Sequence, residues 1–394
     1  MNPVMAEKKP KILFTISNIQ IGGGAEKVCT TVANEFLNQG IDVELLTFYT
    51  AEKEHVFNGV RNSMHEATPA SLLGKLPRAL KRIWIVKKTC KENNIDLIIS
   101  FLEESNYYVL LSKLLLRNKT KMIVSVRNDP SQYPRIYQWL IKILYPHAEK
   151  VVAVTKGVEQ TLKDQYGLKN TTTIYNPLDY EKIREDITQP LPEEYRWIEK
   201  RSPLFITIGR LAQQKGQWYM ISAFAHLVKE KPDAPLVIIG EGPYRERLTQ
   251  LIKELGLENH VYLIGKQKNV YQFLQIADVF ILTSLWEGMP NVLLEALASG
   301  SKVVATDAST GAREILAPQI ELNKKLDYPF YTESGVLVEP FNKNDNRSDL
   351  EKKLAEVFLN EIDTIKVGDM KIGQRFSLPL IFAEWMNLYH KLYD

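Results

Sequence analysis

Two glutamates eight positions apart, Glu287 and Glu295, lie in the stretch LWEGMPNVLLEALASG (285 to 300). Burying a carboxylate among Leu and Ala is costly unless the carboxylate has a polar partner. Pro290 suits a first helical position, so the sequence predicts a helix that begins near Pro290 or Asn291. The amide groups and positive dipole end of that helix would favour a phosphate. Two carboxylates beside a diphosphate could hold sugar hydroxyls, one on a ribose and one on a hexose, unless both glutamates are ordinary surface residues.

A second charged stretch, GRLAQQKGQ (209 to 217), directly follows an expected strand. Arg210 and Lys215 stand on it, and Gly209 and Gly216 allow close approach of the backbone. A guanidinium fork and a point charge together could neutralise a diphosphate. The alternative is that they are two common surface cations.

Three further glycine-containing turns follow expected strands. NIQIGGGAEKV (18 to 28) holds three consecutive glycines, whose amides could cradle phosphate, although it is not a G-x-G-x-x-G motif. The position of Glu26, in the first turn of the expected helix, is adequately explained by its favourable interaction with the helix dipole. GEGPYRERL (240 to 248) and GKQKNV (265 to 270) could touch a base or a hexose.

The elements that must position these loops are short β-branched runs alternating with helical patterns, which are typical of parallel α/β architecture. The sequence therefore predicts two doubly wound parallel sheets, whose ligands bind beyond the carboxyl ends of the strands. The expected strands are 11–17, 43–48, 96–100, 121–126 and 150–154 in the first half, and 204–209, 236–240, 261–265, 278–284, 302–306 and 335–339 in the second.

The length of 394 residues favours two domains. Residues 178–202 are polar, contain proline and lack strand character, so the boundary is predicted there. We expect a first Rossmann-like domain over 1–180 and a second over 181–375. The terminal stretch 376–394 is predicted to form a helix that crosses back onto the first domain.

The composition is that of an ordinary globular protein, with 45% hydrophobic and 25% charged residues. Cys29 and Cys90 offer neither a disulfide framework nor metal-ligand spacing, which fits a reducing compartment. The N-terminal apolar run of about five residues is too short for a signal peptide, and no run approaches the ~20 apolar residues of a membrane span. We therefore expect a cytoplasmic or peripheral protein.

Charge is unevenly distributed. Residues 1–180 hold 24 Lys and Arg against 17 Asp and Glu, whereas the remainder holds 26 against 30. The segment 75–91 has seven basic residues, no acidic ones and interleaved apolar side chains. One interpretation is a surface that meets anionic lipid head groups, and the other is the solvated face of an ordinary helix. No nucleic-acid motif accompanies the charge, so nucleic acid is not expected as a partner.

Taken together, these stretches resemble the retaining glycosyltransferases of family 4, whose GT-B fold consists of two facing Rossmann-like domains. The matching residues run in the expected order through nearly the whole chain: Gly23-Gly24-Ala25-Glu26, Asn176-Pro177, Gly209-Arg210 with Lys215-Gly216, Gly240-Glu241-Gly242-Pro243, and Glu287-x7-Glu295.

The resemblance implies a nucleotide-diphosphate sugar, most readily a UDP-sugar, in the second domain and an acceptor in the first. Glu295 would bind the ribose and Glu287 the hexose, while Arg210 and Lys215 would hold the diphosphate. The resemblance implies no cofactor and no metal ion. Arg210, Lys215 and the helix dipole would instead stabilise the negative charge of the diphosphate. The remaining donor-binding residues implied are Gly23, Gly24, Gly209, Glu241, Gly242, Lys266, Gly288, Met289 and Asn291.

One departure from the family concerns a histidine that many relatives carry after the strand matching 121–126. Here Arg127 stands in that region, where it could contact sugar or phosphate, but a group that stays protonated cannot act as a general base. With retention of configuration, a front-face reaction is implied in which the leaving phosphate takes the acceptor proton. Glu287 as a covalent nucleophile is the less favoured alternative.

The stretches SVRNDP (125 to 130) and SFLEESN (100 to 106) are similar to those of transferases that extend lipid-linked glycans. We therefore expect transfer of a hexose or N-acetylhexosamine to a glycan on a polyprenyl diphosphate, at the inner face of the cell membrane. The alternatives are a soluble or protein acceptor, or a silent partner subunit. A silent subunit should have lost Arg210, Lys215 or Glu287, and all three are present.

Overall fold

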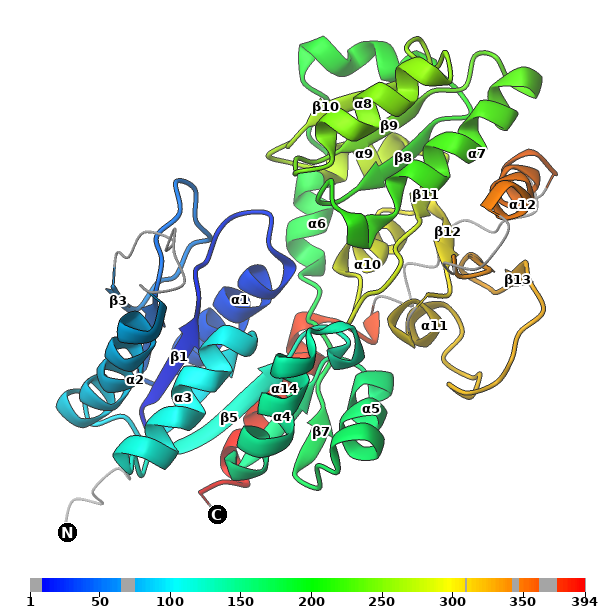
Figure 1. Ribbon diagram of the computed structural model, residues 1–394. Helices are drawn as coiled ribbons and strands as arrows, with labels where there is room; N and C mark the ends of the chain where they lie inside the picture. The colour runs from blue at the N-terminus through cyan, green and yellow to red at the C-terminus, as the bar shows by residue number, and fades with distance from the viewer. Residues whose placement is uncertain (1–8, 65–74, 309, 342–346, 361–373, 394) are drawn as a thin grey trace. The chain divides into compact units, whose positions relative to one another are not determined.

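The computed structural model describes residues 9–64, 75–308, 310–341, 347–360 and 374–393 (Figure 1). The chain divides into two compact units. Unit 1 comprises residues 1–175 and 382–394, and unit 2 comprises residues 176–381. These bounds lie a few residues away from the domain limits that the sequence predicts, at 180/181 and 375/376. Asp394, the end of the predicted terminal helix, lies outside the described residues.

Unit 1 is built on a parallel sheet with the strand order β3-β2-β1-β4-β5-β6-β7. The sequence predicts five of these strands, but it misses β3 and β7, at the two edges. Their sequences, VRNS and TTT, lack an apolar run because edge strands stay partly exposed. The strands are β1 Ile12–Ile16, β2 Val43–Thr47, β3 Val60–Ser63, β4 Leu97–Phe101, β5 Lys121–Val126, β6 Lys150–Ala153 and β7 Thr171–Thr173.

Unit 2 repeats the arrangement with the order β10-β9-β8-β11-β12-β14-β13, in which β13 alone of the described strands pairs antiparallel. The predicted α/β class with two doubly wound sheets is thus confirmed. The strands are β8 Phe205–Ile208, β9 Leu236–Ile239, β10 Val261–Gly265, β11 Val279–Leu282, β12 Lys302–Thr306, β13 Phe330–Tyr331 and β14 Val336–Val338.

Helices connect successive strands, as parallel pairing requires. In unit 1 they are α1 Gly24–Asn38, α2 Lys75–Glu92, α3 Glu103–Leu116, α4 Arg135–Leu144 and α5 Lys156–Tyr166. In unit 2 they are α6 Tyr180–Ile187, α7 Gln217–Glu230, α8 Arg245–Glu254, α9 Tyr271–Ile276, α10 Asn291–Ala298, α11 Thr310–Leu316 and α12 Arg347–Asn360.

The last helix, α14 (Leu378–His390), begins in unit 2, and from Phe382 onward it belongs to unit 1. The Phe382 ring meets Phe36 of α1 edge-on at 5.0 Å, and the Trp385 ring stacks on Phe101 of β4 at 6.0 Å. Trp385 is 1% exposed. The C-terminal helix therefore completes the core of unit 1 with aromatic rings.

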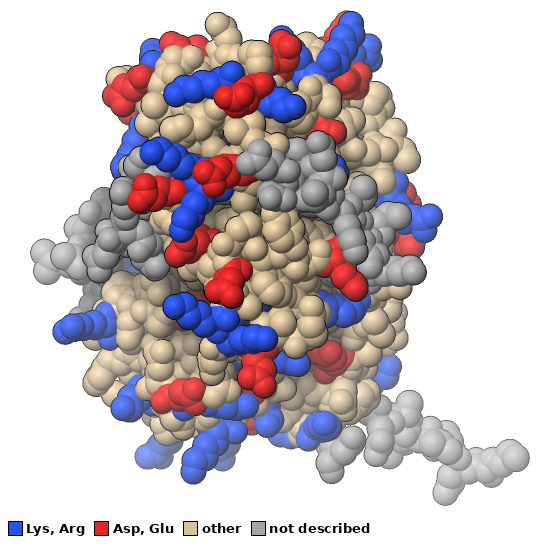
Figure 2. All heavy atoms as spheres, turned by 90° about the vertical axis from the view of Figure 1, so that its right-hand side faces the viewer, with Lys and Arg blue, Asp and Glu red and all other residues tan. Residues whose placement is uncertain are grey.

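Acidic and basic side chains are interspersed over the face of the molecule drawn in Figure 2. Among the described residues, no helix is both long enough and apolar enough to cross a bilayer.

Candidate functional site

The centre of the unit 2 sheet is a switch point. β8 and β11 are parallel neighbours, β9 lies on the other side of β8, and β12 lies on the other side of β11. Ligands of doubly wound sheets bind beyond the carboxyl ends of the strands at such a point. The loops that follow β8 and β11 here are 209–216 and 283–290, which contain the predicted residues Lys215 and Glu287.

Lys215 and Glu287 form an ion pair across the switch point, between Nζ and Oε1. Their side chains are 18% and 11% exposed. Glu287 also accepts hydrogen bonds from Ser284 Oγ at 2.7 Å and Gln214 Nε2 at 3.4 Å. Sequence spacing places these two side chains on one sheet edge, and the structure brings them into contact. The carboxylate is held in one orientation by donors from both loops.

The two loops are also joined through their backbones. Thr283 Oγ1 donates to the carbonyl of Lys215 at 3.1 Å, and the Leu285 amide donates to the carbonyl of Gln214 at 2.7 Å. Gly216 has φ 58°, and a Cβ there would lie 2.3 Å from the carbonyl oxygen of Thr283. Only glycine fits this position without strain, and the loops are therefore held in register.

Helix α10 begins at Asn291, as the sequence predicts, with Pro290 at the N-cap in an extended conformation. Glu295 lies in the second turn and is 9% exposed. It accepts a hydrogen bond from the Tyr271 hydroxyl at 3.2 Å. Glu295 is therefore a buried carboxylate with a polar partner, rather than the surface residue that the alternative interpretation requires.

The donor loop, defined here as Gly288–Pro290, is buried and is held from the side by Asn176. The Asn176 amide donates to Met289 Sδ at 3.2 Å, and Asn176 Nδ2 donates to Asn291 Oδ1 at 2.5 Å. The Asn176-Pro177 match in the sequence thus has a local role that the sequence alone does not reveal. It positions two residues predicted to line the donor.

The glycines of the neighbouring loops lie against one another. A Cβ on Gly240 would lie 2.0 Å from the carbonyl oxygen of Gly209, and a Cβ on Gly242 would lie 2.3 Å from that of Leu211. Side chains at 240 and 242 would push apart the loops after β8 and β9. These glycines therefore support the packing of the site, whatever they contact in a ligand.

Sequence reasoning missed the connection after β12. Gly311, in the first turn of α11, would place a Cβ 2.2 Å from the carbonyl oxygen of Gly288 and 3.0 Å from Pro290 Cδ. Gly311 therefore lies directly against the donor loop. The available signal was the stretch DASTG, which follows the predicted strand KVVAT as the other site loops follow theirs.

Three other predicted donor contacts lie in the loops after β8, β9 and β10 with exposed side chains: Arg210, Glu241 and Lys266. Glu241 pairs at 2.8 Å with Arg245, the first residue of α8. The structure therefore places these three residues at the predicted sheet edge, and their contacts with a ligand remain predictions.

In unit 1, the glycine turn leads into α1, with Gly23 as N-cap and Gly24 as its first residue. A Cβ on Gly23 would lie 2.0 Å from Glu26 Oε2. The carboxylate of Glu26 thus lies over the turn that the sequence predicts phosphate to approach, consistent with its expected role at the helix dipole.

Arg127 follows β5 and is 8% exposed. Its guanidinium lies over the Phe101 ring at 4.5 Å and faces the Trp385 ring at 5.9 Å, both within cation–π range. Burial lowers the pKa of Arg127 to about 9. The group is therefore still a cation at neutral pH, and its predicted contact with sugar or phosphate is not tested.

Unit 1 has a switch point of its own, between β1 and β4. Ser17, just after β1, donates to Glu104 at the start of α3 with an Oγ–Oε2 distance of 2.9 Å. Tyr49, just beyond β2, donates to Glu104 Oε1 at 2.9 Å. Leu102, between β4 and α3, has φ 69° and ψ 150°, a conformation that costs a non-glycine residue on the order of 1–3 kcal/mol. Such strain is concentrated at functional sites, so this polar cluster is a candidate acceptor site.

The basic segment 75–91 forms most of α2, and its contact with anionic lipid stays a prediction. Arg82 is 2% exposed, pairs with Glu104 at 2.7 Å, and lies over the Tyr49 ring at 4.6 Å. Lys87 donates to the carbonyl of Leu116 at 2.5 Å. Both residues fall on the side of the helix that packs on its own unit. Among the apolar residues of α2, Leu80 and Trp84 are exposed.

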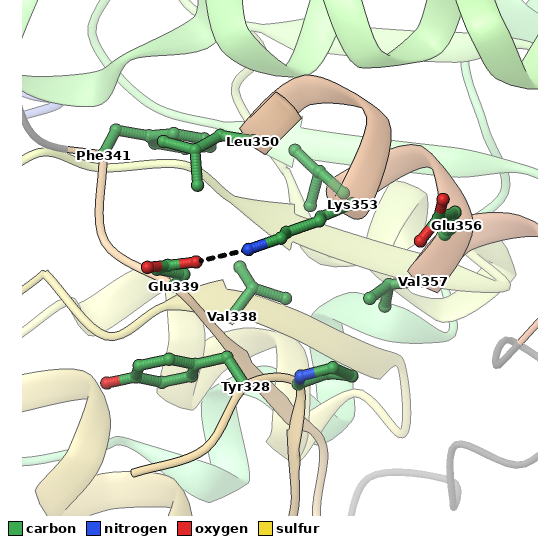
Figure 3. A pocket seen from close by; sticks show the side chains of 10 residues that line it. Tyr328, Val338, Glu339, Phe341, Leu350, Lys353, Glu356 and Val357 are labelled. Carbon is green, nitrogen blue, oxygen red and sulfur yellow. Dashed lines mark hydrogen bonds and ion pairs between the residues drawn. The ribbon is translucent and has the colours of Figure 1, made fainter. Parts of the chain in front are cut away.

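A separate cavity in unit 2 lies between β14 and α12 (Figure 3). Leu350 and Val357 line it from α12, with Phe341 beside Leu350 and Val338 facing them, and Lys353 pairs with Glu339 at 3.1 Å. None of the predicted donor residues lines this cavity. It is therefore not the site that the sequence predicts.

The described residues contain no group of three or more His, Cys, Asp or Glu side chains arranged to hold a metal ion. Two doubly wound parallel sheets, with a charged pair at the switch point of the second, define the chain as an α/β protein of the GT-B class.

Comparison with known proteins narrows this class. The family model for glycosyl transferases group 1 matches residues 193–364, and the model for glycosyltransferase family 4 matches residues 22–182. An uncharacterised glycosyltransferase of Methanocaldococcus jannaschii is 34% identical over 337 residues, which cover 79% of this chain and 83% of that protein.

A second relative, from Campylobacter jejuni, is the N-acetylgalactosamine-N,N'-diacetylbacillosaminyl-diphospho-undecaprenol 4-alpha-N-acetylgalactosaminyltransferase. It is 31% identical over 336 residues, covering 82% of this chain and 84% of that enzyme. The structure of Anabaena HepE in complex with UDP and glucose covers 97% of this chain and 100% of its own, with a TM-score of 0.73 and 21% identity, a likeness of fold alone. The chain belongs to glycosyltransferase family 4, and it is a glycosyltransferase of GT-B fold.

Proposed function

We propose that the protein is a retaining glycosyltransferase that moves a hexose or N-acetylhexosamine from a UDP-sugar to a glycan carried on a polyprenyl diphosphate. The observation that carries this proposal is the Lys215–Glu287 ion pair at the switch point, with the amino end of α10 and buried Glu295 just beyond it in the chain. A cation, a helix N-terminus and two carboxylates suit a diphosphate that lies between two sugars.

In the proposed reaction the bond between sugar C1 and the phosphate oxygen breaks, and the acceptor oxygen bonds to C1 on the same face. The acceptor hydroxyl gives its proton to the departing phosphate. Lys215 and Arg210 stabilise the charge that grows on the nucleoside diphosphate, as a metal ion would elsewhere. Glu287 holds the hexose hydroxyls, in an orientation that Ser284 and Gln214 already fix.

The proposed acceptor is supported by the Campylobacter jejuni relative, whose name specifies a diphospho-undecaprenol substrate. The excess of basic residues in 1–180 suits a protein that works at an anionic membrane surface. The polar cluster of Ser17, Tyr49 and Glu104 supplies hydroxyl and carboxylate groups for an acceptor sugar.

The decisive experiment is a panel of UDP-, GDP-, ADP- and dTDP-sugars, each followed by proton NMR with and without a polyprenyl-diphosphate glycan. We expect turnover of a UDP-sugar with the first-formed product still α, and the same rate in EDTA. A β product would contradict retention, loss of rate in EDTA would contradict metal independence, and turnover of another nucleotide alone would contradict the UDP assignment. Silence with every donor would favour the partner-subunit alternative.

Glu295→Ala is expected to raise the donor KM by about tenfold and to change kcat little, because ribose contacts bind ground and transition states alike. Steady-state kinetics against donor concentration measure both constants. Tyr271→Phe is the matched control, since it removes the 3.2 Å hydrogen bond to Glu295 and leaves the carboxylate in place, and its effect should be smaller. A fall in kcat without a change in KM would assign Glu295 to the reacting sugar instead.

A further inference from the structure

Helix α4 of unit 1 presents a row of apolar side chains to solvent. Ile136, Trp139 and Ile143 are 59%, 56% and 41% exposed. Their spacing of three and then four residues places them along one face of the helix. The opposite face is packed, because Ile141 and Leu144 are buried. The exposed row is therefore a feature of a well-anchored helix, rather than of a loosely packed one.

The position of α4 is fixed by its neighbour α3. The Tyr137 ring stacks on Tyr107 of α3 at 5.9 Å, and the Tyr107 hydroxyl donates to the Tyr137 carbonyl at 3.2 Å. Both helices link parallel strands, so both run antiparallel to the strands. Their carboxyl ends therefore lie at the same edge of the sheet. At the end of α3, Leu114 and Leu115 are exposed as well.

The charged side chains of α4 itself have one sign, whereas Lys113 of the neighbouring α3 pairs with Glu149 at 2.6 Å. Arg135 and Lys142 of α4 are exposed, as are Arg117 and Lys119 just after α3. Residues 130–148 contain no Asp or Glu. This differs from the face drawn in Figure 2, where both signs are interspersed. Apolar and tryptophan side chains interleaved with cations on one helix are typical of helices that lie in the interface of an anionic bilayer.

We propose that the exposed face of α4, defined by Arg135, Ile136, Trp139, Lys142 and Ile143, is the surface by which the protein docks on an anionic lipid bilayer. The inference rests on the proposed lipid-linked acceptor, and it adds α4 to the membrane contact that the sequence predicts for residues 75–91. The exposed charges of this face, Arg135 and Lys142, are both cations, so an anionic bilayer is the occupant whose charge complements it. The row of Ile136, Trp139 and Ile143 enters the boundary between head groups and acyl chains, while the cations meet lipid phosphates.

The test is co-sedimentation of the full chain with vesicles of phosphatidylcholine alone or with added phosphatidylglycerol. Wild type should bind the anionic vesicles, and Ile136→Ser with Trp139→Ser should weaken binding by at least about tenfold. Val56→Ser is the matched control, since Val56 is an exposed apolar residue of the same unit, outside α4. Equal binding by the double variant and wild type would overturn the proposal.

A second measurement does not depend on the stability of the double variant. Trp139→Phe keeps an apolar side chain, and brominated lipids should quench wild-type fluorescence more than that of this variant. Equal quenching would place Trp139 outside the bilayer and overturn the proposal. A wild type that ignores anionic vesicles but dimerises through α4 would assign the face to a second copy instead.

Transfer kinetics separate this inference from the proposed function. The double variant should hydrolyse the donor, and glycosylate a detergent-free short-chain acceptor, at the wild-type rate, but it should lose rate on an acceptor embedded in anionic vesicles. If the wild-type protein turned over no donor, the proposed function would be wrong. If the double variant used the vesicle-embedded acceptor at the wild-type rate, only the docking surface would be wrong.

Discussion

Lys215→Ala is expected to lower kcat for sugar transfer by about 10²- to 10³-fold, the usual cost of removing one preorganised group that stabilises transition-state charge. Negative charge on the nucleoside diphosphate grows as the bond to sugar C1 breaks, so Lys215 binds the transition state more tightly than the donor. The donor KM should change much less. Lys231→Ala removes an exposed lysine at the end of α7 and should turn over like wild type.

The ion pair complicates this experiment, because the substitution also leaves Glu287 without its cation. A double-mutant cycle with Glu287→Gln separates the two roles. If Lys215 acts on the leaving group, Lys215→Ala should still depress kcat when residue 287 is a neutral glutamine. If Lys215 merely positions Glu287, adding Lys215→Ala to Glu287→Gln should not lower kcat further. That result would mean that our assignment of Lys215 to the diphosphate is wrong.

Much of this site could be predicted because parallel strands bring their following loops to one edge. The β-branched runs predict that Arg210, Lys215 and Glu287 lie on strand-end loops, and the structure has them there. The start of α10 near Pro290 follows from the preference of proline for the amino end of a helix, where its missing N–H costs nothing, and the structure places Pro290 at the N-cap. Local chemistry of this kind is readable without knowing which strands are neighbours.

Contacts between distant segments could not be predicted in the same way. The burial of Arg82 depends on Glu104 and on aromatic rings just after β2 and in α3, none of which its own helix reveals. The basic segment therefore looked more uniform in sequence than it is in space. The polar cluster at Glu104 was missed for the same reason, since Ser17 lies 87 residues away and meets it only because β1 and β4 pair.

The contact of Gly311 with the donor loop also belongs to this class, and it carries the second large prediction. Gly311→Ala should lower kcat/KM for transfer by about 10²-fold, since a misplacement of about 1 Å at a site can cost that much. The added Cβ would lie 2.2 Å from the carbonyl oxygen of Gly288, a backbone atom that cannot rotate away. Relief requires α11 and Gly288–Pro290 to move apart, and we expect the shift to reach the amino end of α10, which follows Pro290 directly.

Gly300→Ala provides the control at the other end of α10. Gly300 has φ 82°, and a Cβ there would meet no atom within 4 Å. Gly300→Ala should therefore strain the backbone, which lowers the free energy of unfolding by about 1 kcal/mol and lowers the melting temperature. It should not move the donor loop. Comparing kcat/KM with the thermal midpoint separates the two effects. Gly311→Ala should lower kcat/KM far more than its melting temperature would explain. If kcat/KM fell equally in both variants, and only as far as their stability fell, the donor loop would tolerate displacement.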